Sequence, residues 1–437
     1  MATNSMNSAP IPKEKIMRHV FPNVRPILPP KGQIPHGYRL MVYKWSFPEE
    51  RIGETVEIDG QRVKKMLTFD LNIPEAGFAE KVNAFPQGSK EAKLAFVKNY
   101  PCPHACPGCF NNAELTNPIM TLPEVMHVVN QAKDLGLESM KFLGPGELLA
   151  NSQLFHILDE LAKRNIIAGI FTKAAIMGND QLSQHYHGIS SEELTRRLAA
   201  YPNTTFLVGA RSFDPAMENR FIPQNLHEIR ERFNYHEARN LAMERLCGLG
   251  MNGDLMHQRL EIACAPVTSE NLEGALEMYQ WGTERNIPVV LPPTMVSGKG
   301  HKLEKAAAEV KFENDYISLA VEVYTWAIER GVMTLDQLYH EGAASYIGIA
   351  PCNQLTHGLY LHYDGQVWRC PGNDTPDFIV HSNIRTAPLV DIWKNSKNYA
   401  VNQFNNGCVK DGISLPRRFY TEVPERVSAN LQSQVAV

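Results

Sequence analysis

The chain has 437 residues, of which 43% are hydrophobic and 21% charged, and its formal net charge is −4. This length predicts two or three domains, and the composition is typical of a protein with a large buried core. The negative balance offers no general attraction to nucleic acid or to an anionic membrane, so we expect neither as a partner. The sequence has no run of eighteen apolar residues, and its first residues, MATNSMNSAPIPKEK, lack the apolar core of a secretory signal. We therefore expect a cytoplasmic protein.

Residues 1–92 are expected to form a small N-terminal β element behind a proline-rich arm. YRLMVYKWSF (38–47) predicts a strand, and ETVEIDGQRVKKMLTFDLNI (54–73) predicts a hairpin that turns at Asp59 and Gly60. We expect these strands to precede the first unit that carries chemistry.

Strands and helices alternate in residues 93–312. Strands are expected at KLAFVKNY (93–100), SMKFLG (139–144), IIAGIFTKA (166–174), TTFLVGAR (204–211), QRLEIACAPV (258–267) and IPVVLPPTMV (287–296). An amphipathic helix is expected in each of the five intervals. This alternation predicts an α/β fold with a parallel sheet, and six units predict a partial (β/α)6 barrel of the TIM type. Ligands bind such sheets at the carboxyl ends of the strands.

Residues 313–437 are expected to form a third unit. NDYISLAVEVYTWAIERG (314–331) predicts a helix that leads out of the barrel, and APLVDIWKNSK (387–397) predicts another. The tail RVSANLQSQVAV (426–437) has little apolar surface to bury, so we expect it to be mobile.

The stretch YPCPHACPGCFNN (100–112) sets Cys102, Cys106 and Cys109 inside eight positions. Its prolines and glycine exclude a helix, and a short loop can place three thiolates on one face of a metal centre. A closed iron–sulfur cubane takes four cysteines, so three leave one iron with an open position. The alternative is a zinc knuckle with His104 or a distant cysteine as fourth ligand.

The C-x3-C-x2-C loop after the first predicted strand resembles that of the radical S-adenosylmethionine (radical SAM) superfamily. This resemblance implies a catalytic [4Fe–4S] cluster on Cys102, Cys106 and Cys109, whose open iron binds S-adenosylmethionine (SAM). It also implies that one electron, from an external donor such as flavodoxin or ferredoxin, cleaves SAM to methionine and a 5′-deoxyadenosyl radical. That radical removes a hydrogen atom from the substrate.

The resemblance extends to the turns after the later strands. FLGPGELL resembles the family's glycine-glycine-glutamate stretch, in which Glu147 would bind the SAM amino group; the alternative is a turn with Glu147 at a helix start. Arg211 and Ser212 are alternatively a surface cation and a helix cap, and Asn271, in the valine-threonine…asparagine turn, is alternatively a cap as well. The SAM contacts that the resemblance implies are Phe110, Gly144, Gly146, Glu147, Thr172, Arg211 and Ser212.

A second group of cysteines follows the barrel. Cys352 and Cys370 flank a hairpin that turns at Asp364 and Gly365, and Cys408 comes later. The C-x12-G-x4-C spacing and the NI…L..IW run after it resemble the SPASM and twitch extensions of radical SAM enzymes. This implies one auxiliary [4Fe–4S] cluster on the three cysteines. The alternative is three scattered core thiols.

The fourth ligand of that second centre stays open: Cys264, Asp411, a residue of the N-terminal arm or the substrate itself could supply it. Cys247 and Cys264 are otherwise interpreted as core residues.

These features predict a radical SAM enzyme whose auxiliary cluster oxidises or binds a substrate that is a small molecule or a peptide. Residues 1–92 show strands and few helices where peptide-modifying relatives often carry a winged-helix domain, which favours a small-molecule or leader-independent substrate. One alternative is an enzyme that crosslinks or epimerises peptides (RiPP maturation). Another, from a different class, is a non-catalytic iron–sulfur or zinc protein.

Overall fold

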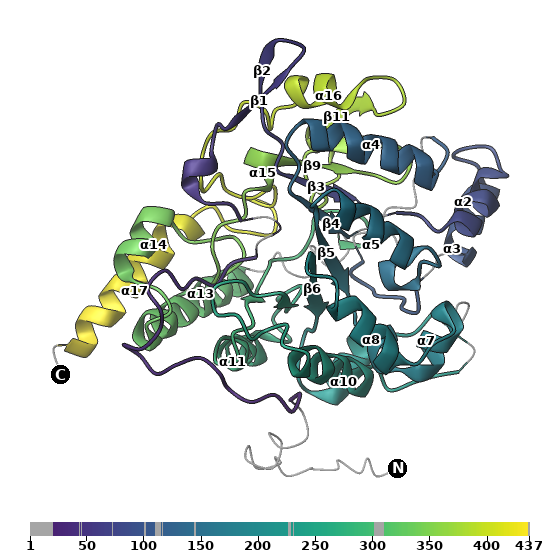
Figure 1. The fold of residues 1–437 in the computed structure, drawn as a ribbon. Helices are drawn as coiled ribbons and strands as arrows, with labels where there is room; N and C mark the ends of the chain where they lie inside the picture. Colours follow the sequence, from purple (N-terminus) through teal and green to yellow (C-terminus); the bar gives the residue numbers. More distant parts are fainter. Residues whose placement is uncertain are drawn as a thin grey trace, which may run out of the picture.

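The fold is built around one large sheet, of which the view in Figure 1 shows the central strands. The computed structural model describes residues 21–435 apart from 43, 45, 72, 100–101, 110–114, 116, 144–145, 226–228, 230 and 301–309. The strands are β1 (Thr55–Ile58), β2 (Gln61–Lys64), β3 (Thr68–Leu71), β4 (Ser139–Phe142), β5 (Ile167–Thr172), β6 (Thr204–Gly209), β7 (Leu260–Ala263), β8 (Val289–Val290), β9 (Gly358–Leu361), β10 (Gln366–Trp368) and β11 (Ile379–Asn383). None of the described helices is both long and apolar enough to cross a membrane.

The helices alternate with the barrel strands and then cover the extension. The α-helices are α2 (Ala76–Asn83), α3 (Lys90–Asn99), α4 (Leu122–Asp134), α5 (Leu154–Lys163), α6 (Ala175–Gly178), α7 (Asp180–His187), α8 (Ser191–Ala199), α9 (Pro215–Phe221), α10 (Tyr235–Gly248), α11 (Leu272–Thr283), α13 (Val310–Arg330), α14 (Leu335–Glu341), α15 (Gln354–His357), α16 (Leu389–Asn395) and α17 (Phe419–Val435). Short 3₁₀ turns are η1 (Glu49–Arg51), η2 (Leu148–Ala150) and η3 (Pro376–Phe378).

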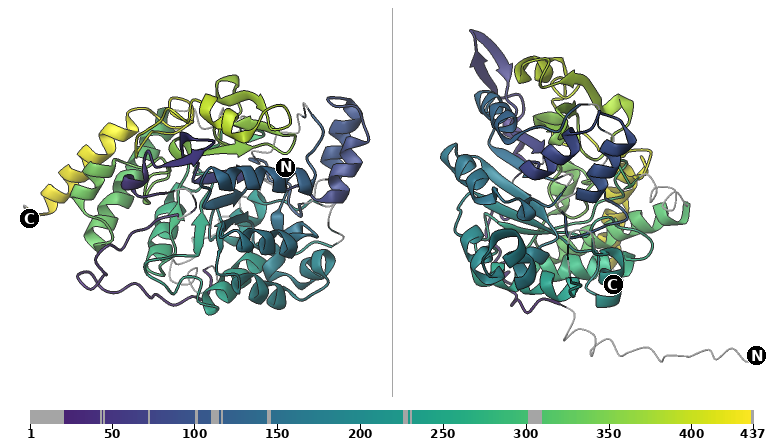
Figure 2. Two further views of the ribbon diagram at one scale, coloured as in Figure 1. Left: turned by 45° about the horizontal axis from the view of Figure 1, so that its top comes forward. Right: turned by 90° about the vertical axis from the view of Figure 1, so that its right-hand side faces the viewer.

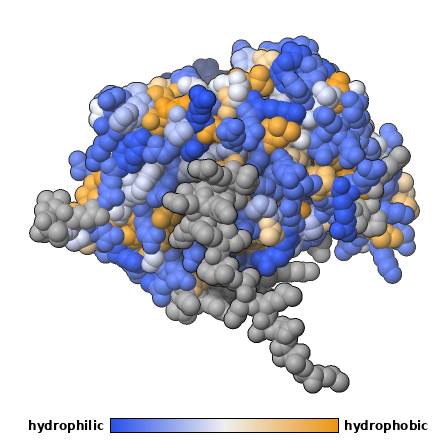
Figure 3. Space-filling view, turned by 90° about the horizontal axis from the view of Figure 1, so that it is seen from below, coloured by the Kyte–Doolittle hydropathy of each residue, from blue (hydrophilic) through white to orange (hydrophobic). Residues whose placement is uncertain are grey.

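Six neighbouring strands, β3 to β8, are parallel and follow the chain order. The helices between them begin at capping residues: Thr121 and Glu124 form a reciprocal capping box on α4, and Ser190 caps α8. Apolar residues of these helices pack on the sheet, and Figure 3 shows that most of the lower face of the molecule is hydrophilic. The predicted parallel, six-strand barrel is therefore present.

The first strand of the barrel is not where the sequence predicts it. The sequence predicts this strand at residues 93–100, but residues 90–99 form helix α3, which buries Ala92, Ala95 and Phe96 at helical spacing. The first barrel strand is β3, part of the stretch expected to be a hairpin arm. Only β1 and β2 form that hairpin, with its turn at Asp59 and Gly60 as predicted.

Two further expectations about the chain ends are wrong. The described residues of 38–47 form no strand. In the tail expected to be mobile, residues 426–435 belong to helix α17, which packs against α13 and buries Phe419, Val423 and Val427. These three residues are spaced four apart and so lie on one face of the helix, which supplies the apolar surface that the last twelve residues lack.

The extension is joined to the barrel through the sheet. Strand β9 pairs in parallel with β3, and the hairpin β9–β10 turns at Asp364 and Gly365, as predicted. Gly365 has φ +85°, a conformation that favours glycine. Barrel and extension thus form one nine-stranded sheet in the order β11-β10-β9-β3-β4-β5-β6-β7-β8.

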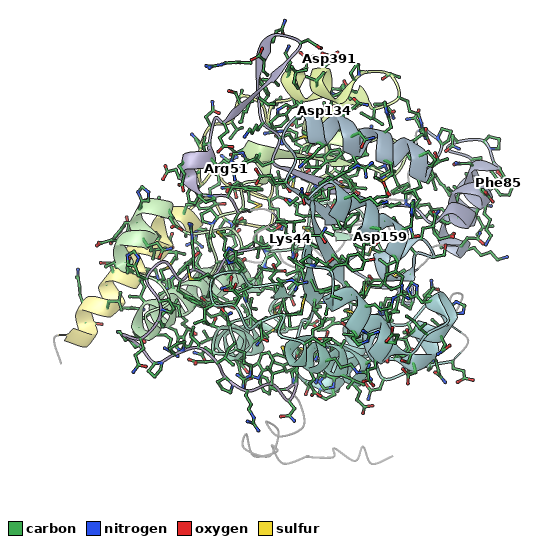
Figure 4. The ribbon with its side chains drawn as sticks, viewed as in Figure 1. Lys44, Arg51, Phe85, Asp134, Asp159 and Asp391 are labelled. Carbon is green, nitrogen blue, oxygen red and sulfur yellow. The ribbon has the colours of Figure 1, made fainter. Side chains whose placement is uncertain are left out.

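Lys44 closes the amino-terminal end of the barrel from within, and Figure 4 labels it at the centre of the fold. Its ammonium contacts the Glu261 carboxylate and donates to Thr205 Oγ1 at 3.1 Å, and its carbonyl accepts from Thr68 Oγ1 at 2.8 Å. A Cβ at Gly169 would lie 2.1 Å from Lys44 Cδ, so the lysine passes directly over this glycine. Lys44 therefore fills the space between the first residues of these barrel strands.

Replacing one member of the Lys44–Glu261 pair should destabilise the protein more than replacing both. Both side chains are fully buried, so Lys44→Met or Glu261→Leu alone leaves an unpaired buried charge and should cost about 3–5 kcal/mol in unfolding free energy. The double variant should recover a large part of that loss. Urea unfolding followed by circular dichroism measures the unfolding free energy of the three variants. If the loss in the double variant equals the sum of the two single losses, the two residues do not stabilise the protein as a pair.

Candidate functional site

The loop of Cys102, Cys106 and Cys109 lies in the connection between β3 and α4, after the two helices α2 and α3. Ala105 N donates to Pro223 O at 2.7 Å, and Asn225 N donates to Pro103 O at 2.9 Å. On the other side Lys299 N donates to Cys109 O at 2.8 Å. Because these partners follow β6 and β8, the loop is held at the carboxyl ends of the barrel strands, where the sequence predicts a ligand site.

The three thiols form one electrostatically coupled group. Burial raises the pKa of Cys102 well above its usual range, and the charges of Glu147, Cys106 and Cys109 add to this. Burial also raises the pKa of Cys106 to about 11, although the nearby Lys173 opposes it. The raised pKa values favour the protonated thiols of Cys102 and Cys106, so a metal centre would have to displace those two protons.

Glu147 joins the turns after β4 and β5. Its carboxylate accepts from Thr172 Oγ1 at 3.0 Å, from Lys173 N at 3.1 Å and from Leu149 N at 3.3 Å. Burial raises the pKa of Glu147 to about 7. Gly146 beside it has φ +92°. Two of the predicted SAM contacts, Glu147 and Thr172, are thus hydrogen-bonded to each other, within electrostatic reach of Cys102.

Arg211 and Ser212 follow β6 and are buried. Their backbone amides donate to the Glu218 carboxylate at 3.0 and 2.8 Å, and the Arg211 guanidinium lies 3.6 Å from the centre of the Phe221 ring. The alternative of a surface arginine is therefore excluded. Burial lowers the pKa of Arg211, and the charge of Cys106 is among those that oppose this, so the guanidinium lies within electrostatic reach of that thiol.

Two predicted contacts, Phe110 and Gly144, lie outside the described residues. Asn271 precedes α11 but makes no side-chain cap. Its amide instead donates to Arg211 O at 3.0 Å, and its Oδ1 accepts from Thr268 N at 2.7 Å. Asn271 therefore braces the turn after β6 instead of capping a helix.

The second group of cysteines is also brought together. Burial raises the pKa of Tyr346 well above its usual range, and the charges of Cys408, Cys352 and Cys370 all add to this. Burial also raises the pKa of Cys408, and the Lys410 ammonium, which lies 4.9 Å from the centre of the Tyr346 ring, opposes that rise. The charges of Cys408 and Cys352 also act on Cys370, so the three thiols lie near one another.

This second group is attached to the same end of the barrel. Val296 N donates to Gly372 O at 2.8 Å, and Ser414 Oγ donates to Thr294 O at 2.6 Å. The segment after β8 therefore holds the loops of Cys370 and Cys408.

The residues considered as a fourth ligand have other partners. The Asp411 carboxylate accepts from Cys408 N at 3.0 Å and from Tyr420 Oη at 2.8 Å. The Cys264 thiol donates to Arg211 O at 3.5 Å. Cys247 lies on α10, among Arg285 and Glu244, and belongs to neither group. Among the described residues, no three Cys, His, Asp or Glu side chains are close enough to hold a single metal ion.

A buried ion pair joins strands β3 and β4. Asp70 Oδ1 is 2.7 Å from Lys141 Nζ, and Lys141 also donates to Gln354 Oε1. Burial raises the pKa of Asp70 to about 6 although Lys141 opposes it. The charge of Asp70 helps to raise the pKa of Tyr346, beside the second group, and of Tyr360. The charge of Cys109 also raises the pKa of Tyr360.

Sequence reasoning missed this pair, although the signal was available. Asp70 and Lys141 stand in the short strand sequences TFDL and SMKF, where a charge among buried positions is unusual. Their partnership depends on the register that places Asp70 opposite Lys141. The buried pair Glu218–Arg239, 3.1 Å apart, was also missed, because it depends on how helices α9 and α10 pack together.

No protein-family model matches the chain, and no curated protein matches it. Its fold is found among solved structures. Native anSMEcpe with bound AdoMet is 13% identical, with a TM-score of 0.51, over 85% of this chain and 98% of that one. A histidine-tagged form of anSMEcpe with bound AdoMet gives the same values. Streptococcus suis SuiB bound to precursor peptide SuiA is 14% identical, with a TM-score of 0.46, over 80% of this chain and 68% of that one. The predicted fold class is confirmed: the chain has a mixed α/β fold with a mostly parallel partial barrel, and AdoMet-bound anSMEcpe shares this fold.

Proposed function

We propose that the protein is a radical SAM enzyme that reductively cleaves SAM and removes a hydrogen atom from its substrate, with a second iron–sulfur centre in the extension. The observation that carries the proposal is the arrangement of two separate three-thiol groups at the carboxyl end of one partial barrel. The fold shared with AdoMet-bound anSMEcpe supports it.

The residues present fit [4Fe–4S] centres. Each iron of such a cluster takes one thiolate, so three thiols that are close but do not converge on one point suit a cluster better than a single ion. A lysine beside each group, Lys173 at the first and Lys410 at the second, would offset the negative charge of bound thiolates. The cluster at Cys102, Cys106 and Cys109 would supply the electron that cleaves SAM.

The residues around the first group fit SAM. Glu147 presents a buried carboxylate suited to an ammonium group, and Thr172 and the Lys173 amide hold that carboxylate in place. The Arg211 guanidinium, held by Phe221 stacking, is suited to the SAM carboxylate. Gly146, beside Glu147, has φ +92°, a conformation that favours glycine.

We place the substrate, a small molecule or a peptide, beside Asp70 and Lys141. The charges of Asp70 and Cys109 both act on Tyr360, and the charges of Asp70 and the second thiol group both act on Tyr346. Asp70 therefore lies near residues that are close to each thiol group. A buried carboxylate and ammonium can together bind one donor and one acceptor of a polar substrate. The alternative from another class, an electron carrier or zinc protein, makes no use of a SAM site.

The first prediction separates these two classes. After anaerobic reconstitution with iron and sulfide, the wild type should form 5′-deoxyadenosine from SAM and dithionite, measured by liquid chromatography. Replacing Cys102, Cys106 and Cys109 by Ala should abolish this product, because the open-site cluster loses all its protein ligands. Cys247→Ala is the matched control and should keep the wild-type rate. Bound zinc and no 5′-deoxyadenosine in the wild type would refute the proposed function.

The second prediction concerns the extension. The reconstituted wild type should bind about eight irons per chain, and the variant with Ala at positions 352, 370 and 408 about four. The variant should still cleave SAM, because the first thiol group is intact. Iron and sulfide analysis with electron paramagnetic resonance measures this. A wild-type count of about four irons per chain would contradict the proposed second iron–sulfur centre.

The third prediction concerns Glu147. A charged hydrogen bond contributes about 1.5–3 kcal/mol, so Glu147→Gln should weaken SAM binding by about tenfold or more. Equilibrium dialysis of SAM against the reconstituted protein measures the affinity. Glu193→Gln, on the exposed surface of α8, serves as the control. Equal SAM affinities in the two variants would contradict a role of Glu147 in binding SAM.

A further inference from the structure

Helix α3 exposes apolar side chains directly before the first cysteine loop. Leu94 is 63% exposed and Val97 is 62% exposed, the two highest values among the large hydrophobic residues that the structure describes. Phe85, in the turn before α3, is 39% exposed and lies at the edge of the molecule in Figure 4. Apolar side chains gathered in this way are typical of a surface that contacts another protein.

The same face of α3 is positively charged. Lys90, Lys93 and Lys98 are exposed, and Glu91 is the one exposed acid on the helix, so its charge is about +2 against −4 for the whole chain. None of these lysines forms an ion pair with a described residue. Leu94 and Val97 lie among them, one turn apart. We call Lys90, Lys93, Leu94, Val97 and Lys98 the α3 face.

The opposite side of the helix leads to the first thiol group. Phe96 is buried and stacks on Tyr363, with ring centres 5.3 Å apart and planes at 29°. The charge of Cys109 in turn acts on Tyr363, whose pKa is raised mainly by burial. Helix α3 ends at Asn99, three residues before Cys102. The right-hand view of Figure 2 shows α2 and α3 on the side of the molecule turned toward the viewer. One helix thus presents the α3 face to solvent and packs an aromatic ring toward the cysteine loop.

We propose that the α3 face is the docking surface of an acidic one-electron carrier protein of the flavodoxin type. The proposal rests on the proposed function. The reduced flavin would give up one electron, and the iron–sulfur centre that Cys102, Cys106 and Cys109 would hold would accept it, so the flavin would be oxidised and the centre reduced by one electron each. An acidic partner is favoured because its charge complements the lysines. A second copy of this chain is disfavoured, because a symmetric contact would set lysines against lysines.

The test compares two electron sources on the reconstituted enzyme with SAM. Dithionite is small and needs no docking surface, whereas flavodoxin hydroquinone, kept reduced by its NADPH-dependent reductase, does. Lys93→Glu/Lys98→Glu and Leu94→Ser/Val97→Ser should lower flavodoxin-driven formation of 5′-deoxyadenosine by about tenfold or more and leave the dithionite-driven rate unchanged. Lys163→Glu on α5 and Leu249→Ser after α10, both exposed elsewhere, should leave both rates unchanged.

Binding gives a second readout. Calorimetric titration of the wild type with flavodoxin should show an affinity that falls as salt is raised from about 0.05 to 0.5 M, and the Lys93→Glu/Lys98→Glu variant should lose most of it. Equal flavodoxin-driven rates in wild type and α3 variants would overturn the docking proposal. So would a concentration-dependent dimer that the same variants dissolve, since a second copy would then cover the α3 face. Absence of product with dithionite in the wild type would instead overturn the proposed function.

Discussion

The pairing of β3 with β4 on one side and β9 on the other determines where both thiol groups lie. Thr68 stands opposite Ser139 of β4 and Gly358 of β9. The second contact requires glycine, because a Cβ at position 358 would lie 2.5 Å from Thr68 O. The first cysteine loop is in the connection that follows β3, and the hairpin of the second group begins with β9. One strand thus fixes the relative position of two groups that are about 250 residues apart in the sequence.

The polar residues inside the barrel have two different relations to this arrangement. Lys44 and Glu261 fill the amino-terminal end, where Thr68, Ser139 and Thr205 also contact the lysine. Asp70 and Lys141 lie further along the strands. Buried ion pairs add little stability compared with well-packed apolar residues. Under the proposed function, the second pair would offer its charges to a bound substrate.

Much of the fold could be predicted because its signals are local. Five of the six barrel strands, the helix caps at Thr121 and Ser190, and the turn at Asp364 and Gly365 all follow from short patterns. The first strand could not be located in this way. The run LAFV (94–97) is equally compatible with a strand and with one helix turn, whereas β3 is only four residues long and contains a charge.

The candidate site divides in the same manner. Spacing and position indicated the two cysteine groups and the turn at Glu147, and the structure brings the described members of each together. The Asp70–Lys141 and Glu218–Arg239 pairs depend on contacts between distant segments, which no single stretch of sequence reveals.

Under the proposed function, the order of groups across the molecule gives the substrate a defined place. Phe96 of α3 stacks on Tyr363, on which the charge of Cys109 acts. The charges of Cys109 and Asp70 both act on Tyr360. The charges of Asp70 and the second thiol group both act on Tyr346. Asp70 is thus the position shared by the two groups. An electron would enter from the α3 side to start the reaction, and an electron removed from the substrate would leave toward Cys352, Cys370 and Cys408. In this arrangement the electron donor and the second centre would approach the substrate from different elements, α3 and the extension, so the incoming electron would not have to pass through the second centre.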